Sequence, residues 1–159
     1  MQLISLVITV AALLGSALVA GTFFAFSSFV MPALCQLPHP RGLEAMQQIN
    51  RSVLNRWFLG VFMGTGVLSA AFISLAVAYK PSASVWSLLA SVLYLVGSFG
   101  ITAARNVPLN NELDAVDPQS PSAGDVWNSY ALMWTRWNHV RTVASIVSTA
   151  AFAIALRTG

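Results

Sequence analysis

The chain has 159 residues, of which 57% are apolar and 8% carry a formal charge, and its net charge is +3. A soluble domain has about a quarter of its residues charged, so this composition excludes an ordinary soluble protein. High hydrophobicity with few charges also excludes a disordered chain. The single cysteine, Cys35, excludes an intrachain disulfide framework. Eight basic residues scattered along the chain exclude a nucleic-acid-binding surface.

The first predicted element is an apolar helix over residues 3–34. Positions 1–40 contain no Asp, Glu, Lys or Arg. An α-helix needs about 20 apolar residues to cross the hydrocarbon core of a bilayer, so this run is long enough to span it. It lacks the basic start and the cleavage site of a secretory signal, which favours a retained membrane helix. Pro32 and Pro38 are predicted to end it.

Two further spans are predicted, at residues 43–79 and 82–105. Each contains an uncharged run of sufficient length, and Lys80, Pro81 and Ser82 form a tight turn between them. From residue 106 to residue 123 the composition changes to Asn, Asp, Pro, Ser and Gly, which predicts the one long loop.

The last predicted helix covers residues 124–157, but its uncharged run is short. Residues 142–156 are too few to cross the hydrocarbon alone. The span must therefore begin upstream, which brings Asn138, His139 and Arg141 to the membrane boundary or inside it. Ionisable groups at that depth are costly and suggest a functional site by default.

The sequence therefore predicts one all-α domain over residues 1–159, an integral membrane four-helix bundle with up-down-up-down topology. Helices two and four extend beyond the membrane. Two basic residues lie on the side of the termini, and six lie on the side of the long loops: Arg41, Arg51, Arg56, Arg105, Arg136 and Arg141. The positive-inside rule then predicts a multi-pass protein with cytoplasmic long loops and both termini outside. The lipid bilayer is the expected partner, and the oligomeric state stays open.

Two polar stripes are predicted to line a shared cavity that opens toward the cytoplasmic interface. On helix two, Gln47, Arg51 and Asn55 recur every four residues and share one face. On helix four, steps of 3.6 residues from Trp127 place an aromatic and hydrogen-bonding stripe on one face: Tyr130, Trp134, Asn138, Arg141 and Ser145. Other Trp and Arg residues are predicted to be interfacial anchors: Trp57, Trp127, Arg56 and Arg136.

A third polar segment follows helix three. Asn106 and Asn110 flank Pro108 just outside the predicted span. Asn side chains cap helices and stabilise turns, so one interpretation is a turn with a helix cap. The other is that both amides bind a ligand.

The motifs Asn106-Val-Pro-Leu-Asn110-Asn111-Glu-Leu and Trp134-Thr-Arg-Trp137-Asn138-His139-Val-Arg141-Thr142 resemble the anthrone oxygenase-like family of small four-helix membrane proteins. The segment Gly21-Thr-Phe23-Phe-Ala-Phe26 through Pro32 fits as well, so the resemblance covers nearly the whole chain. It implies oxidation of a planar, hydrophobic tricyclic anthrone to an anthraquinone with molecular oxygen.

That reaction requires a base near neutral pH, donors for a developing oxyanion and a dry aromatic slot. Imidazole suits proton abstraction at pH 7, so His139 is the expected base. Arg141, Asn138 and Asn106 are the expected donors to the oxyanion. The remaining expected substrate contacts are the ring-stacking side chains Trp134, Trp137, Tyr130 and Phe26 and the polar side chains Asn110, Arg51 and Asn55.

No cofactor is predicted, because an anthrone enolate reacts with oxygen directly. A metal at His139 is a minority alternative: His39, Cys35, Glu112 and Asp114 fall on the same side of the membrane, but their spacing matches no metal motif. The other class of function is a non-enzymatic protein that binds a lipid or hydrophobic small molecule, or a membrane partner subunit, with Arg141 and Arg51 binding an anionic group. A transporter is disfavoured, since no inverted repeat is visible.

Overall fold

The computed structural model describes residues 2–79 and 85–158, and the regular structure within them is entirely helical. Four helices are long and apolar enough to cross a membrane: Leu3–Cys35, Arg56–Val77, Val85–Asp114 and Ala123–Thr158. The prediction of an all-α membrane bundle is confirmed. The predicted turn at Lys80, Pro81 and Ser82 lies outside the described residues.

We call each continuous run of helical segments a rod, and the first rod contains a local change of helix type. Helix α1 (Gln2–Ala25) continues through a π-helical segment, η1 (Phe26–Val30), into α2 (Met31–Cys35). Pro32 therefore does not end the rod. In a regular α-helix its ring would clash with the carbonyl four residues earlier, and the wider π turn before it relieves that clash. The rod ends before Pro38, the N-cap of the next helix.

The segment expected as one helix over residues 43–79 consists of two helices, α3 (His39–Ser52) and α4 (Arg56–Tyr79). Asn55 starts the second one, because its Oδ1 accepts the backbone N–H groups of Trp57 and Phe58, both at 3.0 Å. Its Nδ2 donates to the carbonyl of Ser52 at 2.9 Å. This capping turn separates the polar helix α3 from the apolar helix α4.

The third rod is longer than the sequence predicts. It comprises α5 (Val85–Val92), two π-helical segments, η2 (Leu93–Gly100) and η3 (Thr102–Asn106), and α6 (Val107–Asp114). Pro108 lies in the first turn of α6, directly after a π-helical segment, so the rod passes through it. Consequently the non-helical stretch that was expected at 106–123 begins only after Asp114.

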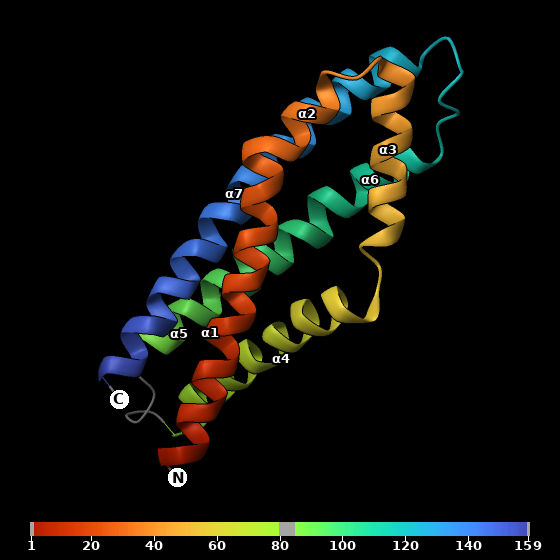
Figure 1. Cartoon of the computed structure of the whole chain (residues 1–159). Helices are drawn as coiled ribbons and strands as arrows, with labels where there is room; N and C mark the ends of the chain where they lie inside the picture. Colours follow the sequence, from red (N-terminus) through yellow and green to blue (C-terminus); the bar gives the residue numbers. More distant parts are fainter. Residues whose placement is uncertain (1, 80–84, 159) are drawn as a thin grey trace.

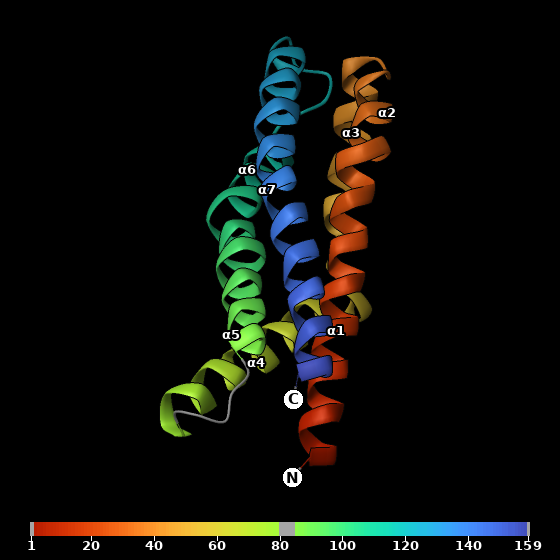
Figure 2. The same cartoon turned by 90° about the vertical axis from the view of Figure 1, so that its left-hand side faces the viewer.

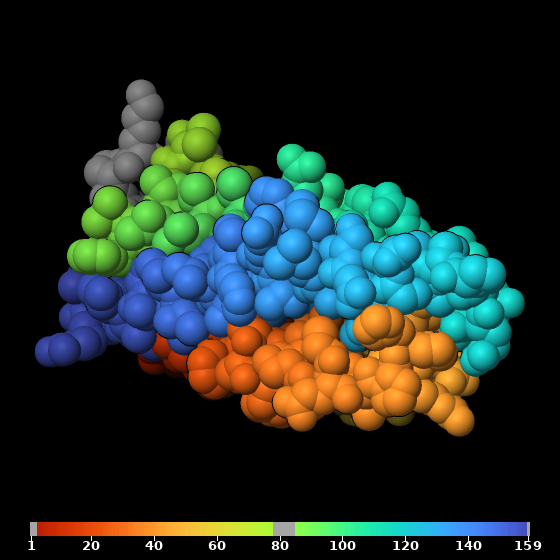
Figure 3. Space-filling model, turned by 90° about the horizontal axis from the view of Figure 1, so that it is seen from above, coloured from red at the N-terminus to blue at the C-terminus, as the bar shows by residue number. Residues whose placement is uncertain are grey.

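Helix α7 (Ala123–Thr158) is the central element, close to the expected 124–157. It packs against α1, α5, η2 and α3, and Figure 3 shows it running between the α1 side and the α5 side of the molecule. Helix α4 packs on α1, α5 and η2, and its C-terminal end diverges from the other helices in Figure 2.

The two ends of the bundle differ. Both termini lie at one end, and α2, α3 and the loop before α7 lie at the other (Figure 1). We call this second end the cap; its core contains Leu43, Met46, Leu113, Trp127 and Tyr130. Below the cap, Arg56 stacks on Trp57 at 5.0 Å and Arg105 on Trp137 at 4.9 Å. Such pairs of Arg and Trp are typical of a membrane boundary.

Candidate functional site

A buried arginine lies at the centre of the bundle. Arg141 is 4% exposed, and its Nη2 donates to Asn138 Oδ1 at 2.7 Å while its Nη1 donates to Thr102 Oγ1 at 3.2 Å. The guanidinium carbon lies 4.2 Å from the ring centroid of Phe23 and 5.1 Å from that of Trp134. Its Nε is buried without a hydrogen-bond partner.

No carboxylate neutralises this guanidinium within the described part of the chain. The ion pairs found there are on the surface of the cap, between Arg41 and Glu44 at 3.6 Å and between Arg51 and Asp114 at 2.7 Å. An isolated charge inside a membrane protein is costly, and its usual partners are an opposite charge, backbone carbonyls or a ligand. Arg141 therefore carries a positive charge that only neutral groups and aromatic faces surround.

Asn138 connects Arg141 to the first rod. It is fully buried, and its Nδ2 donates to the carbonyl of Phe23 and to Ser27 Oγ, both at 2.8 Å. A guanidinium can only donate hydrogen bonds, so the amide oxygen of Asn138 must face Arg141 and the amide nitrogen must face Ser27. The orientation of this amide is thus fixed by its neighbours.

His139 forms the outer end of the same network. Its side chain is exposed, and its Nδ1 lies 2.9 Å from Ser27 Oγ. Ser27 Oγ also lies 3.0 Å from Thr142 Oγ1. Two of the three predicted catalytic side chains, His139 and Arg141, therefore lie on different faces of α7. Hydrogen bonds through Asn138 and Ser27 join them.

A second polar cluster lies closer to the cap. Asn110 Oδ1 accepts hydrogen bonds from Tyr130 Oη at 2.9 Å and from Trp134 Nε1 at 2.8 Å. Asn106 is buried, and its Nδ2 donates to the carbonyl of Trp134 at 3.2 Å. The side chain of Asn106 makes no capping hydrogen bond to α6, so the interpretation of Asn106 as a helix-capping residue is wrong. The Phe26 ring lies 5.3 Å from the Trp134 ring, which completes the cluster.

Three predicted substrate contacts lie outside these clusters. Arg51 is exposed and forms an ion pair with Asp114, and Asn55 is the N-cap residue of α4. Trp137 is half-buried and stacks with Arg105. The predicted stripe on helix two is wrong as a continuous feature, because the helix is interrupted between α3 and α4: Gln47 and Arg51 lie on α3, whereas Asn55 lies in the turn beyond it.

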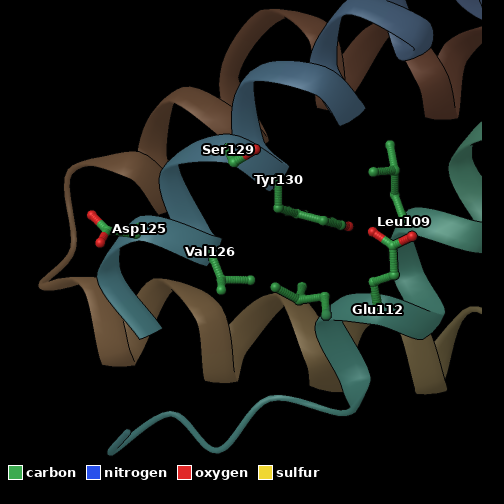
Figure 4. A pocket seen from close by; sticks show the side chains of 7 residues that line it. Leu109, Glu112, Asp125, Val126, Ser129 and Tyr130 are labelled. Carbon is green, nitrogen blue, oxygen red and sulfur yellow. The ribbon is translucent and has the colours of Figure 1, made fainter. Parts of the chain in front are cut away.

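A cleft of about 320 Å³ opens between α6 and the first turns of α7 (Figure 4). It is lined by Leu109, Glu112, Leu113, Asp125, Val126, Ser129 and Tyr130. Tyr130 and Val126 project from α7 toward Leu109 and Glu112 on α6, whereas Asp125 points away from them. Tyr130 is the one predicted site residue in this lining, so the cleft touches the second cluster and lies apart from His139.

The sequence reasoning missed the polar residues that the π-helical segments contribute. Each segment places one hydroxyl against α7: Ser27 from η1, Ser98 from η2, which lies 2.6 Å from Ser145 Oγ, and Thr102 from η3. Serine and threonine in membrane helices usually bond to their own helix, as Ser28 does to the carbonyl of Phe24, so residue type gave no signal. The signal available was Pro32, which lies within a long apolar run.

Residues 2–79 and 85–158 contain no ligand set for the metal ion that was the alternative at His139. There, no group of three or more His, Cys, Asp or Glu side chains is placed to hold a metal ion. His39 lies in the cap beside Gly124, and Cys35 is an exposed free thiol at the end of α2.

The model of a family described as anthrone oxygenase matches residues 55–151. The matched region starts at the Asn55 cap and includes α4, the third rod and most of α7, so it contains Thr102, Asn138, His139 and Arg141. No curated protein and no solved structure matches the chain.

Proposed function

The chain belongs to the anthrone oxygenase family, and from this premise we propose that it is a membrane-embedded oxygenase for a planar, anthrone-type aromatic substrate. In the proposed reaction, one atom of molecular oxygen becomes the new carbonyl oxygen at the methylene carbon. The other oxygen atom leaves as water, together with the two methylene hydrogens.

The proposed chemistry starts with removal of one methylene proton. The electron pair of the broken C–H bond passes into the ring system as an enolate, and this enolate reduces oxygen and forms a C–O bond to it. After protonation the product is a hydroperoxide. Loss of the second methylene proton, with cleavage of the O–O bond, releases water and leaves the ketone. The enzyme must supply a base for the first proton and stabilise the negative charge of the enolate.

We assign the base to His139. Its imidazole is exposed at the outer end of the hydrogen-bond network, one turn of α7 from Val143, which is 61% exposed. Val140 beside it is 44% exposed. Apolar side chains exposed on a membrane helix face lipid, so a substrate dissolved in the bilayer reaches this imidazole laterally.

The buried guanidinium of Arg141 is the observation that carries the proposal. A positive charge without a carboxylate partner attracts the negative charge of an enolate, because Coulomb attraction is little screened where the effective dielectric constant is low. Since Arg141 and His139 lie on different faces of α7, this attraction acts across the helix from the imidazole. Asn138 and Thr102 hold the guanidinium by hydrogen bonds, and two aromatic rings cover it. The charge is therefore fixed in place before the substrate binds.

The test is oxygen consumption by the purified protein in lipid nanodiscs with anthrone as the substrate. We expect the wild-type protein to accelerate anthraquinone formation above the spontaneous rate, with one oxygen molecule consumed per product. Loss of a general base costs about 100-fold or more, so His139→Gln should reduce the rate by at least that factor. The control is His39→Gln, which removes the other histidine, in the cap, and should react like the wild type.

The possible outcomes separate the candidate functions. A fully active His139→Gln protein would remove the imidazole from the mechanism. Saturable binding of anthrone without acceleration by the wild-type protein would favour the non-enzymatic binding function instead.

A further inference from the structure

We propose that Ser27 holds His139 in the tautomer with the proton on Nδ1, so that Nε2 is the basic atom. Ser27 is then a positioning residue for the base. The catalytic consequence rests on the proposed function, whereas the tautomer itself follows from the hydrogen-bond network and is measurable without any substrate.

The argument begins at Arg141, because its guanidinium has no acceptor atom. Its bond to Asn138 Oδ1 at 2.7 Å fixes the amide so that Nδ2 faces Phe23 and Ser27. One amide hydrogen goes to the Phe23 carbonyl, and the other goes to Ser27 Oγ. Ser27 therefore uses one of its two lone pairs to accept from Asn138.

Thr142 limits what remains for Ser27. The Thr142 hydroxyl donates to the backbone carbonyl of Asn138 at 2.8 Å, so its single hydrogen is already committed. Ser27 Oγ lies 3.0 Å from Thr142 Oγ1, and this contact needs a hydrogen between the two oxygens. The Ser27 hydroxyl must supply it, which leaves Ser27 with one free lone pair and no hydrogen.

His139 Nδ1 lies 2.9 Å from that remaining lone pair and must therefore donate to it. Each of the four contacts then contains one hydrogen. The neutral imidazole carries its proton on Nδ1, and the lone pair on Nε2 is free to accept a proton. The nitrogen that a neighbour holds by a hydrogen bond sets the tautomer of a histidine, and the other nitrogen does the chemistry.

The structural test uses nitrogen NMR of protein with labelled histidine. The chain has two histidines, and the signals lost in His139→Gln identify those of His139. At about pH 8, where an ordinary imidazole is neutral, we expect the wild-type protein to show a protonated Nδ1 and an unprotonated Nε2. A protonated Nε2 in the wild-type protein would overturn the proposal.

The variant test uses Ser27→Ala. Without the serine oxygen either nitrogen can carry the proton, so we expect a mixture of tautomers and a kcat lower by about 10-fold or more, with KM little changed. Ser27→Thr keeps the hydroxyl and should restore both the tautomer and kcat. Ser28→Ala is the matched control, because Ser28 is exposed and bonds only within its own helix.

The outcomes distinguish this proposal from the proposed function. If Ser27→Ala keeps a pure Nδ1–H tautomer, Ser27 does not set it and the inference is wrong. If the tautomer shifts while His139→Gln stays fully active, the positioning role stands as structure and the assignment of the base fails. A Ser27→Ala protein that does not fold leaves the wild-type spectrum and the Ser27→Thr variant as the deciding measurements.

Discussion

A guanidinium inside a membrane bundle costs free energy that its hydrogen bonds only partly recover. Insertion of an arginine at the centre of a membrane helix costs about 3 kcal/mol. Arg141 makes two side-chain hydrogen bonds, and its buried Nε makes none. A residue that is retained at such a cost without a carboxylate partner is more consistent with a role in function than with a role in stability.

We therefore predict that Arg141→Met separates stability from activity. Removal of the buried charge offsets the loss of the bonds to Asn138 and Thr102, so the thermal unfolding midpoint in detergent should change by only a few degrees. Loss of a group that stabilises an oxyanion costs about 100-fold or more in kcat. Fluorescence-monitored unfolding and oxygen consumption measure the two effects. A protein that unfolds far more easily yet keeps its specific activity would show that Arg141 is structural.

The sequence revealed some site residues and concealed others, for physical reasons. The uncharged run of the last helix is too short to span the bilayer, so length alone brings Asn138 and Arg141 to the membrane boundary or inside it. The structure adds that both side chains are buried. Arg51 and Asn55 were placed with them because a spacing of four assumes an unbroken helix. Asn55 is itself the N-cap residue of α4, at the point where the helix is interrupted. Residue type does not distinguish an asparagine that caps a helix from one that lies on a helix face.

At the level of the helices, close approach of η2 to α7 brings the third rod against the network. A Cβ on Gly97 would collide with the Cβ of Ala144 on α7, so only glycine fits at the present separation. Gly60 on α4 has nothing within 4 Å of such a Cβ. Both glycines occur in apolar runs, so residue type and local composition do not separate their roles. Only the structure distinguishes them.

We predict that Gly97→Ala destabilises the bundle by about 1–3 kcal/mol, the usual cost of overpacking. Gly60→Ala should be neutral or slightly stabilising, because alanine is the better helix former and meets no neighbour. The double variant Gly97→Ala with Ala144→Gly removes the collision and should recover most of the loss. Unfolding in a mixed-detergent titration measures all three. Equal effects of Gly97→Ala and Gly60→Ala would contradict the close packing of η2 on α7.

The helix ends show a related limit of the sequence. Pro32 and Pro38 were expected to end the first helix, and the change in composition was expected to end the third at residue 105. The first rod ends before Pro38 but passes through Pro32, and the third passes through Pro108, because a π-helical segment precedes each of these two prolines. The length and apolar content of a segment predict that it spans the membrane, because the thickness of the bilayer alone sets the length that is required. The π-helical segments depend on contacts with α7, which a local pattern does not contain.

At the level of the whole molecule, α7 connects the membrane to the cap. Its 36 residues correspond to about 54 Å of helix, which exceeds the roughly 30 Å of the hydrocarbon core. The remainder lies in the cap, where α3 packs against it. Gln47 on α3 fixes the end of α6, because its Nε2 donates to the carbonyls of Leu113 and Val116 at 2.9 Å. The network of Arg141 and His139 thus begins next to Trp137, which stacks with Arg105, on the side of that pair away from the cap.

The sidedness of this arrangement is still a prediction, and the structure refines the count of charges behind it. Arg141 is buried in the site and cannot act as a topological signal. Removing it from the six leaves five on the cap side: Arg41, Arg51, Arg56, Arg105 and Arg136. The opposite side has Lys80 and Arg157, so the positive-inside rule still places the cap in the cytoplasm.

Single cysteines test this orientation in a bacterial inner membrane. Cys35 is exposed and must first be replaced, as in Cys35→Ala. In that background Gln119→Cys reports the loop before α7 and Thr158→Cys reports the end of α7, and both native side chains are exposed. A membrane-impermeant maleimide added to intact cells should label Thr158→Cys at once and Gln119→Cys only after lysis. The reverse pattern would place the cap outside. In that case the five surface arginines would serve the anchoring of the cap at the lipid headgroups, and the charge bias would no longer explain how the protein inserts.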